Sequence, residues 1–206
     1  MWKSYFIAFA LCGVFIASCS TAKVQTNAQT RALAQKHTKI AILPTGIHLT
    51  YSRGVSPVYD KQELESLSKR ISLELYWQLL EKIAKSNSSL LVQNTEQTSA
   101  VYAKLMKTDS FYSPQELCKR FGVDAIIKLE VFSDQLMSSR DISRMDSTAL
   151  RKAVVESTTY YASLFEPSRE AAIWTYKGEY ARGYAATPGN TFASISYDLV
   201  KKLPYW

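Results

Sequence analysis

The chain has 206 residues, a formal net charge of +7 at pH 7, three cysteines and two histidines. Its cationic residues are scattered, with no run of five, which is typical of a solvated surface rather than of a nucleic-acid-binding tail. Three cysteines, one of them within the first 18 residues, exclude a disulfide framework, and the length is enough for one domain with its own core.

The first 18 residues have the pattern of a secretion signal. Lys3 supplies a short basic start, and the stretch from Tyr5 to Ala17 carries no charge but is shorter than the roughly 20 apolar residues that cross a bilayer. It ends in Ile16-Ala17-Ser18-Cys19, which resembles the lipobox of bacterial lipoproteins. The resemblance implies that Cys19 carries a diacylglycerol and begins the mature chain. An ordinary secretory signal with an incidental cysteine is the alternative.

The residues after Cys19 bear on location. Ser20, rather than aspartate, follows the cysteine, and by resemblance to the sorting rule of Gram-negative envelopes this favours the outer membrane. Because residues 21–30 include no acidic residue, we expect a domain that faces the periplasm. Residues 19–37 are expected to form the lipidated cysteine and a flexible tether. The expected partners are the membrane, through the lipid on Cys19, and other envelope proteins, but no nucleic acid.

Residues 38–206 have the pattern of one α/β domain. The apolar run from Lys39 to Pro44 predicts a buried central strand, and Thr45 to Lys61, with its glycines and proline, predicts a long loop. Between Gln62 and Lys85 apolar residues recur every three or four positions, which predicts an amphipathic helix. Within this helix and the strands we expect these residues to pack together: Ile71, Leu75, Ile42 and Ile126.

The following elements alternate in the same way. Further strands are predicted at 89–93 and 124–132, and a helix at 95–106. Ser113-Pro114-Gln115-Glu116 has the spacing of a capping box and predicts a second short helix, which ends at Gly122. Residues 133–152 are polar and charged, and we expect them to form an insertion.

The last part of the domain is predicted to be a hairpin followed by a helix. Residues 154–165 and 171–181 alternate with period two on either side of a turn that contains Pro167. A final helix from Asn190 or Thr191 to Lys202 precedes Pro204. The fold class is therefore α/β, with a single mixed sheet in the order β-α-β-α-α-β, antiparallel hairpin and terminal helix, and with the helices packed on it.

Several of these segments together resemble a known group of lipoproteins. They are the Lys39–Pro44 strand, the long helix, the segment Glu116–Ala125, the hairpin with Trp174, and the terminal helix that leads to Tyr205. In this order, over roughly residues 38–205, they resemble domains similar to the curli-secretion channel lipoprotein (CsgG) and to the amino-terminal domain of TolB. The curli channel builds a pore from inserted segments, whereas the insertion here lacks two amphipathic strands long enough to cross a membrane.

The sequence contains no convincing catalytic or metal-binding motif. Ser66-Leu67-Ser68-Lys69 matches SxxK, but it lies inside the long helix without partner motifs, so a solvated helix face is expected. His37 and His48 are too few for a zinc site and are expected on the surface or in loops. Cys118 is expected to be a buried thiol. We therefore expect no catalytic residue, no metal and no cofactor.

Aromatic residues are abundant, with 13 tyrosines and four tryptophans. Those of the hairpin are expected mostly to pack, whereas Tyr51 and Tyr59, in the predicted loop, are candidate partner-binding residues. The pattern favours a non-enzymatic protein-interaction module that acts in assembly or transport at the envelope. One alternative is a lipoprotein that binds peptidoglycan or another glycan, and a second is an oligomeric secretion-channel subunit, which requires membrane strands in residues 133–152.

Overall fold

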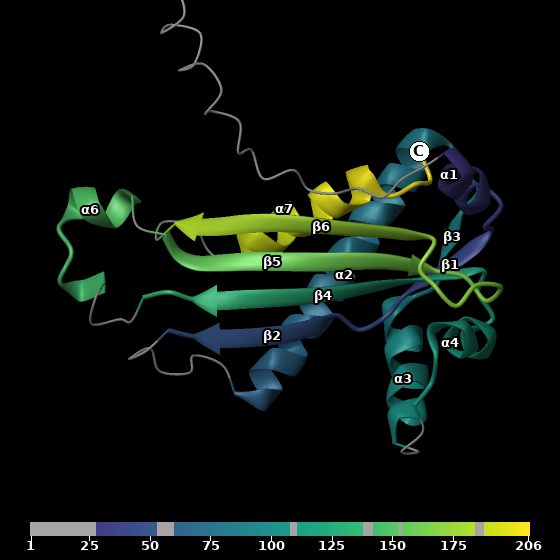
Figure 1. Ribbon diagram of the computed structural model, residues 1–206, viewed down its shortest axis with the longest axis horizontal. Helices are drawn as coiled ribbons and strands as arrows, with labels where there is room; N and C mark the ends of the chain where they lie inside the picture. Colours follow the sequence, from purple (N-terminus) through teal and green to yellow (C-terminus); the bar gives the residue numbers. More distant parts are fainter. Residues whose placement is uncertain (1–27, 53–59, 108–110, 138–141, 153, 184–187) are drawn as a thin grey trace, which may run out of the picture.

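The computed structural model describes residues 28–52, 60–107, 111–137, 142–152, 154–183 and 188–206 (Figure 1). These residues form the single mixed sheet with packed helices that the sequence predicts. The sheet has six strands in the order β3-β1-β4-β5-β6, and β2 also pairs with β4. The signal segment, Cys19 and Tyr59 lie outside the described residues.

The centre of the sheet is parallel and its far side is antiparallel. β1 (Lys39–Ile42) lies between β3 (Leu91–Val92) and β4 (Ala125–Gln135) and is parallel to both. Because both neighbours and both faces shield it, β1 is buried from its second residue onward, as its apolar run predicts. β5 (Val154–Phe165) and β6 (Trp174–Gly183) form the predicted antiparallel hairpin beside β4.

The predicted loop over Thr45–Lys61 is wrong at its start. Gly46–Tyr51 forms β2, which continues from β1 along the same edge of β4 and is parallel to it. Residues 43–45 lie opposite only two residues of β4, so Pro44 occupies a one-residue bulge, where its missing N–H costs no ladder bond. A Cβ on Gly46 would lie 2.1 Å from the carboxylate of Glu130, so a larger residue at the start of β2 would displace this side chain.

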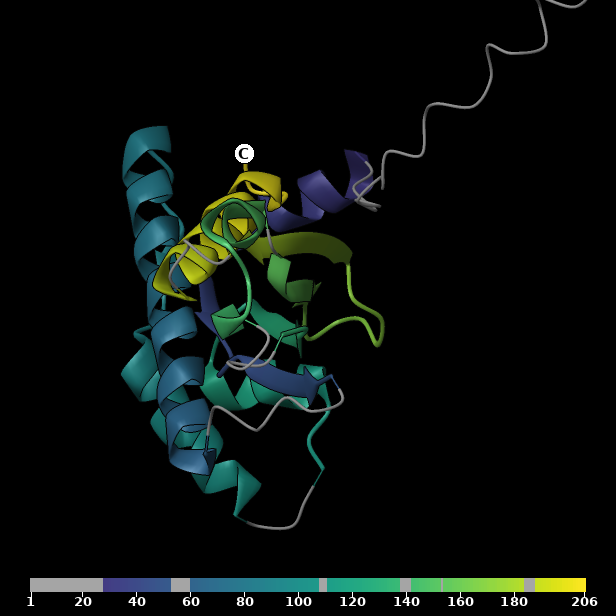
Figure 2. The same ribbon diagram turned by 90° about the vertical axis from the view of Figure 1, so that its left-hand side faces the viewer.

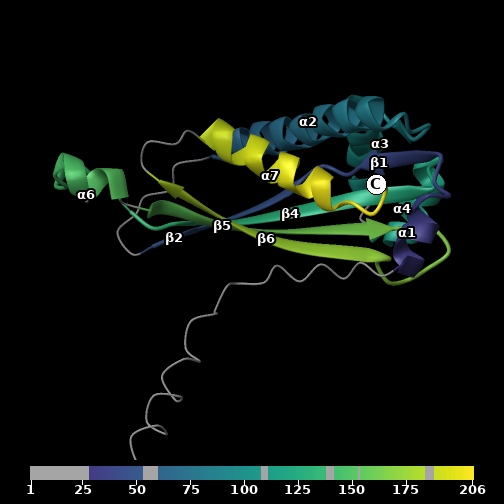
Figure 3. The ribbon, with the colours of Figure 1, turned by 90° about the horizontal axis from the view of Figure 1, so that it is seen from above.

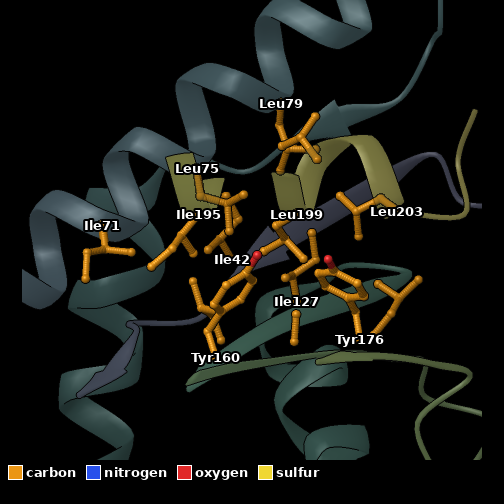
Figure 4. Packing of buried hydrophobic residues seen from close by; sticks show 14 of the residues in the cluster. Ile42, Ile71, Leu75, Leu79, Ile127, Tyr160, Tyr176, Ile195, Leu199 and Leu203 are labelled. Atoms are coloured by element: carbon orange, nitrogen blue, oxygen red, sulfur yellow. The ribbon is translucent and has the colours of Figure 1, made fainter. Parts of the chain in front are cut away.

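Two helices cover one face of the sheet. α2 (Lys61–Ser86) and α7 (Pro188–Lys202) lie on the same side of the strands, as the end-on and upper views show (Figures 2 and 3). Their apolar stripes meet the strands in one core, and its labelled members (Figure 4) are Ile42, Ile71, Leu75, Leu79, Ile127, Tyr160, Tyr176, Ile195, Leu199 and Leu203. α2 begins with a capping box formed by Asp60 and Glu63.

The opposite face is covered at one end only. Leu117, Cys118 and Phe121 of α4 (Pro114–Phe121) pack there, together with α3 (Thr95–Met106), in a second cluster that includes Ile126. The expected contact of Ile126 with α2 is therefore wrong, because Ile127 is the residue of β4 that faces α2. Beyond this cluster, the side chains of β2, β4, β5 and β6 on this face are exposed or only partly buried.

Part of the segment predicted as a tether is ordered. Residues 28–34 form α1 (Ala28–Ala34), in which Thr30 and Ala34, one turn apart, are buried. The Thr30 hydroxyl donates a hydrogen bond of 3.0 Å to the carbonyl oxygen of Ile173, so α1 is attached to the hairpin turn. Residues 35–37, the end of the predicted tether, are also described, whereas residues 19–27 lie outside the described residues.

The predicted insertion is shorter than expected. β4 continues through Gln135, and Ser133 is buried, so the first three residues of the range 133–152 belong to the sheet. Near the other end of the range, α6 (Ser147–Lys152) extends beyond the tips of the strands (Figure 1). No helix among the described residues is both long enough and apolar enough to cross a membrane.

Candidate interaction surface

A groove separates α2 from α3 on the outside of the domain. It consists of two adjoining hollows of about 500 and about 560 Å³ that share Lys69, Ser99 and Ala103. Apolar side chains make up much of its wall: Pro44, Ile47, Leu64, Leu73, Ala100, Tyr102 and Met106. Because small residues of α3 face the larger residues of α2, the two helices leave space between them. We refer to this concavity as the α2–α3 groove.

The rim of the groove includes apolar residues that no element of the domain covers. α2 turns Ile71 and Leu75 toward the sheet, so Leu73 and Trp77 point to the outside of the helix. Leu73 lines the groove and is 44% exposed, and Trp77, one turn further along, is 57% exposed. Their separation of four residues places both on one face of α2. The groove therefore continues into an apolar strip at the surface.

The floor of the groove is held by hydrogen bonds between α2 and the bulge that precedes β2. The N–H of Thr45 donates to Ser72 Oγ at 3.1 Å, and Ser68 Oγ donates to the carbonyl oxygen of Thr45 at 2.6 Å. These bonds satisfy polar groups that would otherwise be costly to bury. They also give Ser68 of the SxxK match a structural role, while Ser66 is exposed on the helix surface, as expected.

A row of aromatic side chains lies on the uncovered sheet face. The ring of Phe132 is stacked on His48 at 4.5 Å between centroids and meets the edge of Tyr161 at 5.6 Å. Glu130 accepts from His48 Nε2 and from Lys128 Nζ, each at 2.8 Å. Burial disfavours the charged form of Glu130, but these two hydrogen bonds outweigh it and lower the pKa of the carboxyl group. We refer to His48, Phe132 and Tyr161 as the aromatic row.

Tyr51, one of the two candidate partner-binding tyrosines, does not line the α2–α3 groove. Tyr51 ends β2, is partly buried, and follows Ile47 on the same face of the strand, beyond the groove. Tyr59 and the lipidation residue Cys19 lie outside the described residues. The roles assigned to these three residues therefore stay predictions.

Cys118 is buried, as the sequence predicts. Its thiol lies 3.7 Å from the carbonyl oxygen of Phe165, and burial raises its pKa to about 11. The thiol is therefore protonated near neutral pH, which makes it a poor nucleophile.

The two histidines differ in their surroundings. His48 is exposed, as expected, but His37 is only 6% exposed, because it lies between Tyr205 and Glu166. Its ring nitrogens are 3.0 Å from the Tyr205 hydroxyl and 3.5 Å from the Glu166 carboxylate. His37 lies in the loop between α1 and β1, as expected, but its side chain is buried by contacts with residues more than 120 positions away, which local sequence does not reveal.

Leu73 and Trp77 are the residues that sequence reasoning missed. They interrupt the polar side of α2 with a second apolar pair, four residues apart, and this signal is visible in the sequence. Among the described residues no group of three or more His, Cys, Asp or Glu side chains is arranged to hold a metal ion.

No protein-family model matches the chain, and no curated protein is significantly similar to it in sequence. Among solved structures, the PelC dodecamer from Paraburkholderia phytofirmans matches with a TM-score of 0.48 and 10% identity, over 90% of this chain and 98% of that chain. Lipoprotein GNA1162 from Neisseria meningitidis matches with a TM-score of 0.44 and 10% identity, over 80% and 96%.

The C-terminal domain of LpoB from Salmonella enterica has a TM-score of 0.35 and 10% identity, over 74% of this chain and 96% of that chain. At these identities and TM-scores the likeness concerns only the general arrangement of helices and strands, and the activities of these proteins do not transfer to the chain. The resemblance to CsgG and TolB stays a prediction from the sequence.

Proposed function

We propose that the chain is a non-enzymatic lipoprotein of the outer membrane that faces the periplasm and binds another envelope protein through the α2–α3 groove. The lipobox-like segment that ends at Cys19 supports the anchor. The observation that carries the binding role is the groove itself, with Leu73 and Trp77 exposed at its rim.

The shape of the groove favours a helical segment as the bound element. A small molecule is usually held in a pocket that encloses most of its surface, whereas this concavity lies open between two helices. An amphipathic helix can lay its apolar side into such a groove, with its charged residues near Lys69 and Glu96 at the rim. Trp77 has the residue type most often found at the energetic centre of an interface.

The test is site-specific photocrosslinking of the full-length protein in intact cells. A photoreactive residue in place of Ala100, which is exposed and lines the groove, should give a discrete crosslinked protein species. The double variant L73A/W77A should reduce this crosslink strongly, because interface anchors contribute about 2 kcal/mol or more each. Both side chains are exposed, so the unfolding temperature should change little.

A matched control is available on the uncovered sheet face. Phe132 and Tyr161 are 42% and 44% exposed, close to the exposure of Leu73, so F132A/Y161A removes similar exposed apolar area elsewhere. This control should keep the Ala100 crosslink. Equal loss of the crosslink in the two double variants, or its persistence in L73A/W77A, would refute the groove as the binding site.

A glycan-binding lipoprotein is the second candidate, and the aromatic row favours it. Phe132 and Tyr161 offer exposed ring surface for a sugar ring to stack on, beside the hydrogen-bonding groups of Glu130 and Lys128. Co-sedimentation with purified peptidoglycan sacculi separates the two functions. Saturable binding that is lost in F132A/Y161A and kept in L73A/W77A, with no protein crosslink from Ala100, would favour the glycan-binding function.

A further inference from the structure

One end of the domain gathers six segments of the chain, among them α1 and the carboxyl terminus. α1, the linker after it, the end of α4, the hairpin turn, the end of α2 and the carboxyl terminus all lie there (Figures 1 and 3). Direct contacts join them. The backbone N–H of Thr38 donates to Asp124 Oδ2 at 2.7 Å, and His37 Nδ1 lies 3.0 Å from the Tyr205 hydroxyl. The ammonium group of Lys82 lies over the ring of Trp206. We call this group of segments the anchor end.

The lipid on Cys19, if present as proposed above, holds this end close to the bilayer. Eight residues, 20–27, separate Cys19 from Ala28, the first residue of α1. An extended chain spans about 3.3–3.6 Å per residue, so the connection reaches about 30 Å at most. The twelve residues of β5 alone extend about 40 Å. The anchor end therefore stays within one domain length of the membrane, and the end that carries α6 can lie further away.

The anchor end has an excess of exposed positive charge. Its exposed cationic side chains are Arg31, Lys36, Lys85, Lys119, Arg120, Arg169, Lys201 and Lys202. Fewer exposed carboxylates lie among them: Glu81, Glu116 and Glu170. Glu81 is paired with Lys85 and buried Glu166 with Arg169, so six of the eight cations lie outside these two ion pairs. Glu116 is engaged in the capping box of α4. The cations are spread over several elements, so the sequence shows no basic run, and only the fold brings them to one end.

We propose that the anchor end docks on the anionic lipid headgroups of the bilayer that holds the acyl chains, and so orients the domain with the α6 end away from the membrane. This inference rests on the proposed lipid anchor. A cation near an anionic bilayer surface gains about a fivefold preference, and the attraction disappears beyond a Debye length of about 10 Å at 0.1 M salt. Acyl anchoring brings the cations within that range, and charge complementarity then selects this face.

The experiment uses the full-length lipoprotein reconstituted in vesicles of phosphatidylcholine, with or without phosphatidylglycerol. Gln35, exposed at the anchor end, and Thr148, exposed on α6, are changed to cysteine in turn and labelled with a fluorophore. Buried Cys118 stays unlabelled. Energy transfer to a headgroup-labelled lipid then reports the distance of each end from the bilayer. Flotation of the protein with the vesicles confirms the lipid anchor separately, so a failed anchor and a failed docking surface give different results.

We expect energy transfer from position 35 to be about twofold or more above that from position 148 in anionic vesicles. The difference should shrink in neutral vesicles and at 1 M salt, where the Debye length is about 3 Å. The triple variant K36Q/K119Q/K202Q should lose the difference while it still floats. K61Q/R70Q/R144Q, which removes three exposed cations from the first part of α2 and from the segment before α6, should keep it.

Three results would overturn the proposal. The first is floating protein with equal transfer from both positions in neutral and anionic vesicles. The second is equal loss of the difference in the two triple variants. The third combines two observations: energy transfer that does not depend on the lipid composition, and a protein crosslink from position 35 in intact cells that K36Q/K119Q/K202Q abolishes. The cations would then bind an acidic protein partner and not the membrane.

Discussion

Single polar side chains hold the hairpin against the last helix. Asp198 of α7 accepts hydrogen bonds from the hydroxyls of Tyr160, at 2.6 Å, and Tyr176. Burial, followed by the bond to Asp198, raises the pKa of Tyr176 to about 12, so its hydroxyl remains a donor. Gly178 gives the Tyr160 ring its space, because a Cβ at this position would lie 2.1 Å from the ring. The tyrosines of the hairpin are thus divided between core positions and the exposed Tyr161.

His37 makes the stability of the domain depend on pH. Burial is the main cause that lowers its pKa below the ordinary value of 6.5, and the hydrogen bond to Glu166 only partly opposes it. The unfolded chain therefore binds a proton more readily than the folded one. It follows that the contribution of His37 to stability is complete above pH 6.5 and is lost as the pH falls below that value.

We predict that the urea midpoint of the domain falls as the pH is lowered from above to below 6.5. The variant H37Q should be less stable at neutral pH but should show a flatter dependence in this range, since it cannot take up the proton. Urea titrations monitored by circular dichroism at several pH values measure this. H48Q, which changes an exposed histidine, is the control and should keep the slope of the wild-type protein. An H37Q profile as steep as that of the wild type would show that another group is responsible.

At the scale of elements, the sequence predicted those segments whose signals are local. The long helix, the capping box of Ser113 and Glu116, and the hairpin are confirmed, because periodicity and cap spacing are set by neighbouring residues. β2 was missed because Pro44 and Gly46 are residue types typical of loops. The segment that follows them is stabilised as a strand by pairing with β4, which is distant in the sequence. α1 was missed because its order comes from contacts with the hairpin turn. The predicted helix at 95–106 is confirmed as α3, and the side chain of Asn94 caps it.

The candidate interaction surface was less predictable than the fold. Tyr51 was selected for its residue type within an expected loop, but it ends a strand. The apolar strip of Leu73 and Trp77 could be read from the helical spacing, whereas the groove beside it requires the packing of α3 against α2. A concave surface is a property of two elements together, so no single segment of the sequence encodes it.

We predict that truncation of two apolar residues of α2 changes the free energy of unfolding by very different amounts. I71A should lower the free energy of unfolding by roughly 2–5 kcal/mol, because Ile71 is fully buried in the main core and its truncation leaves a cavity. L73A, two residues further along but exposed, should change it by only about 0.5 kcal/mol. Urea denaturation of both variants measures this difference. Equal losses of stability would mean that the helix faces are assigned wrongly.

At the scale of the whole molecule, three regions are separated along the domain. The anchor end carries α1 and the carboxyl terminus, the α2–α3 groove lies along the side of the domain, and α6 extends from the opposite tips of the strands (Figure 1). A protein bound in the groove would therefore not compete with contacts that the anchor end makes to a membrane. This separation suits a protein that holds a partner at a fixed place near a bilayer.

The anchor itself gives the last prediction. C19A should abolish acylation and processing at the lipobox, so that the protein keeps its signal segment and is no longer recovered as a mature lipoprotein. Mass spectrometry of the wild-type protein should show a diacylglycerol-modified amino-terminal cysteine. C118A removes a buried thiol of α4 and should leave the modification intact. An unmodified mature amino terminus at another residue in the wild-type protein would contradict the prediction.

The central position of β1 has a mechanical consequence for a tethered protein. With the lipid anchor and the groove partner proposed above, tension from the membrane side would pass through α1 and enter β1 at Lys39, while the partner would pull on α2 and α3. β1 is parallel to strands on both sides, so this load acts along its axis on two ladders of hydrogen bonds at once. The bonds share the force in shear and do not open one after another, which suits the domain to carry load between a partner and its lipid.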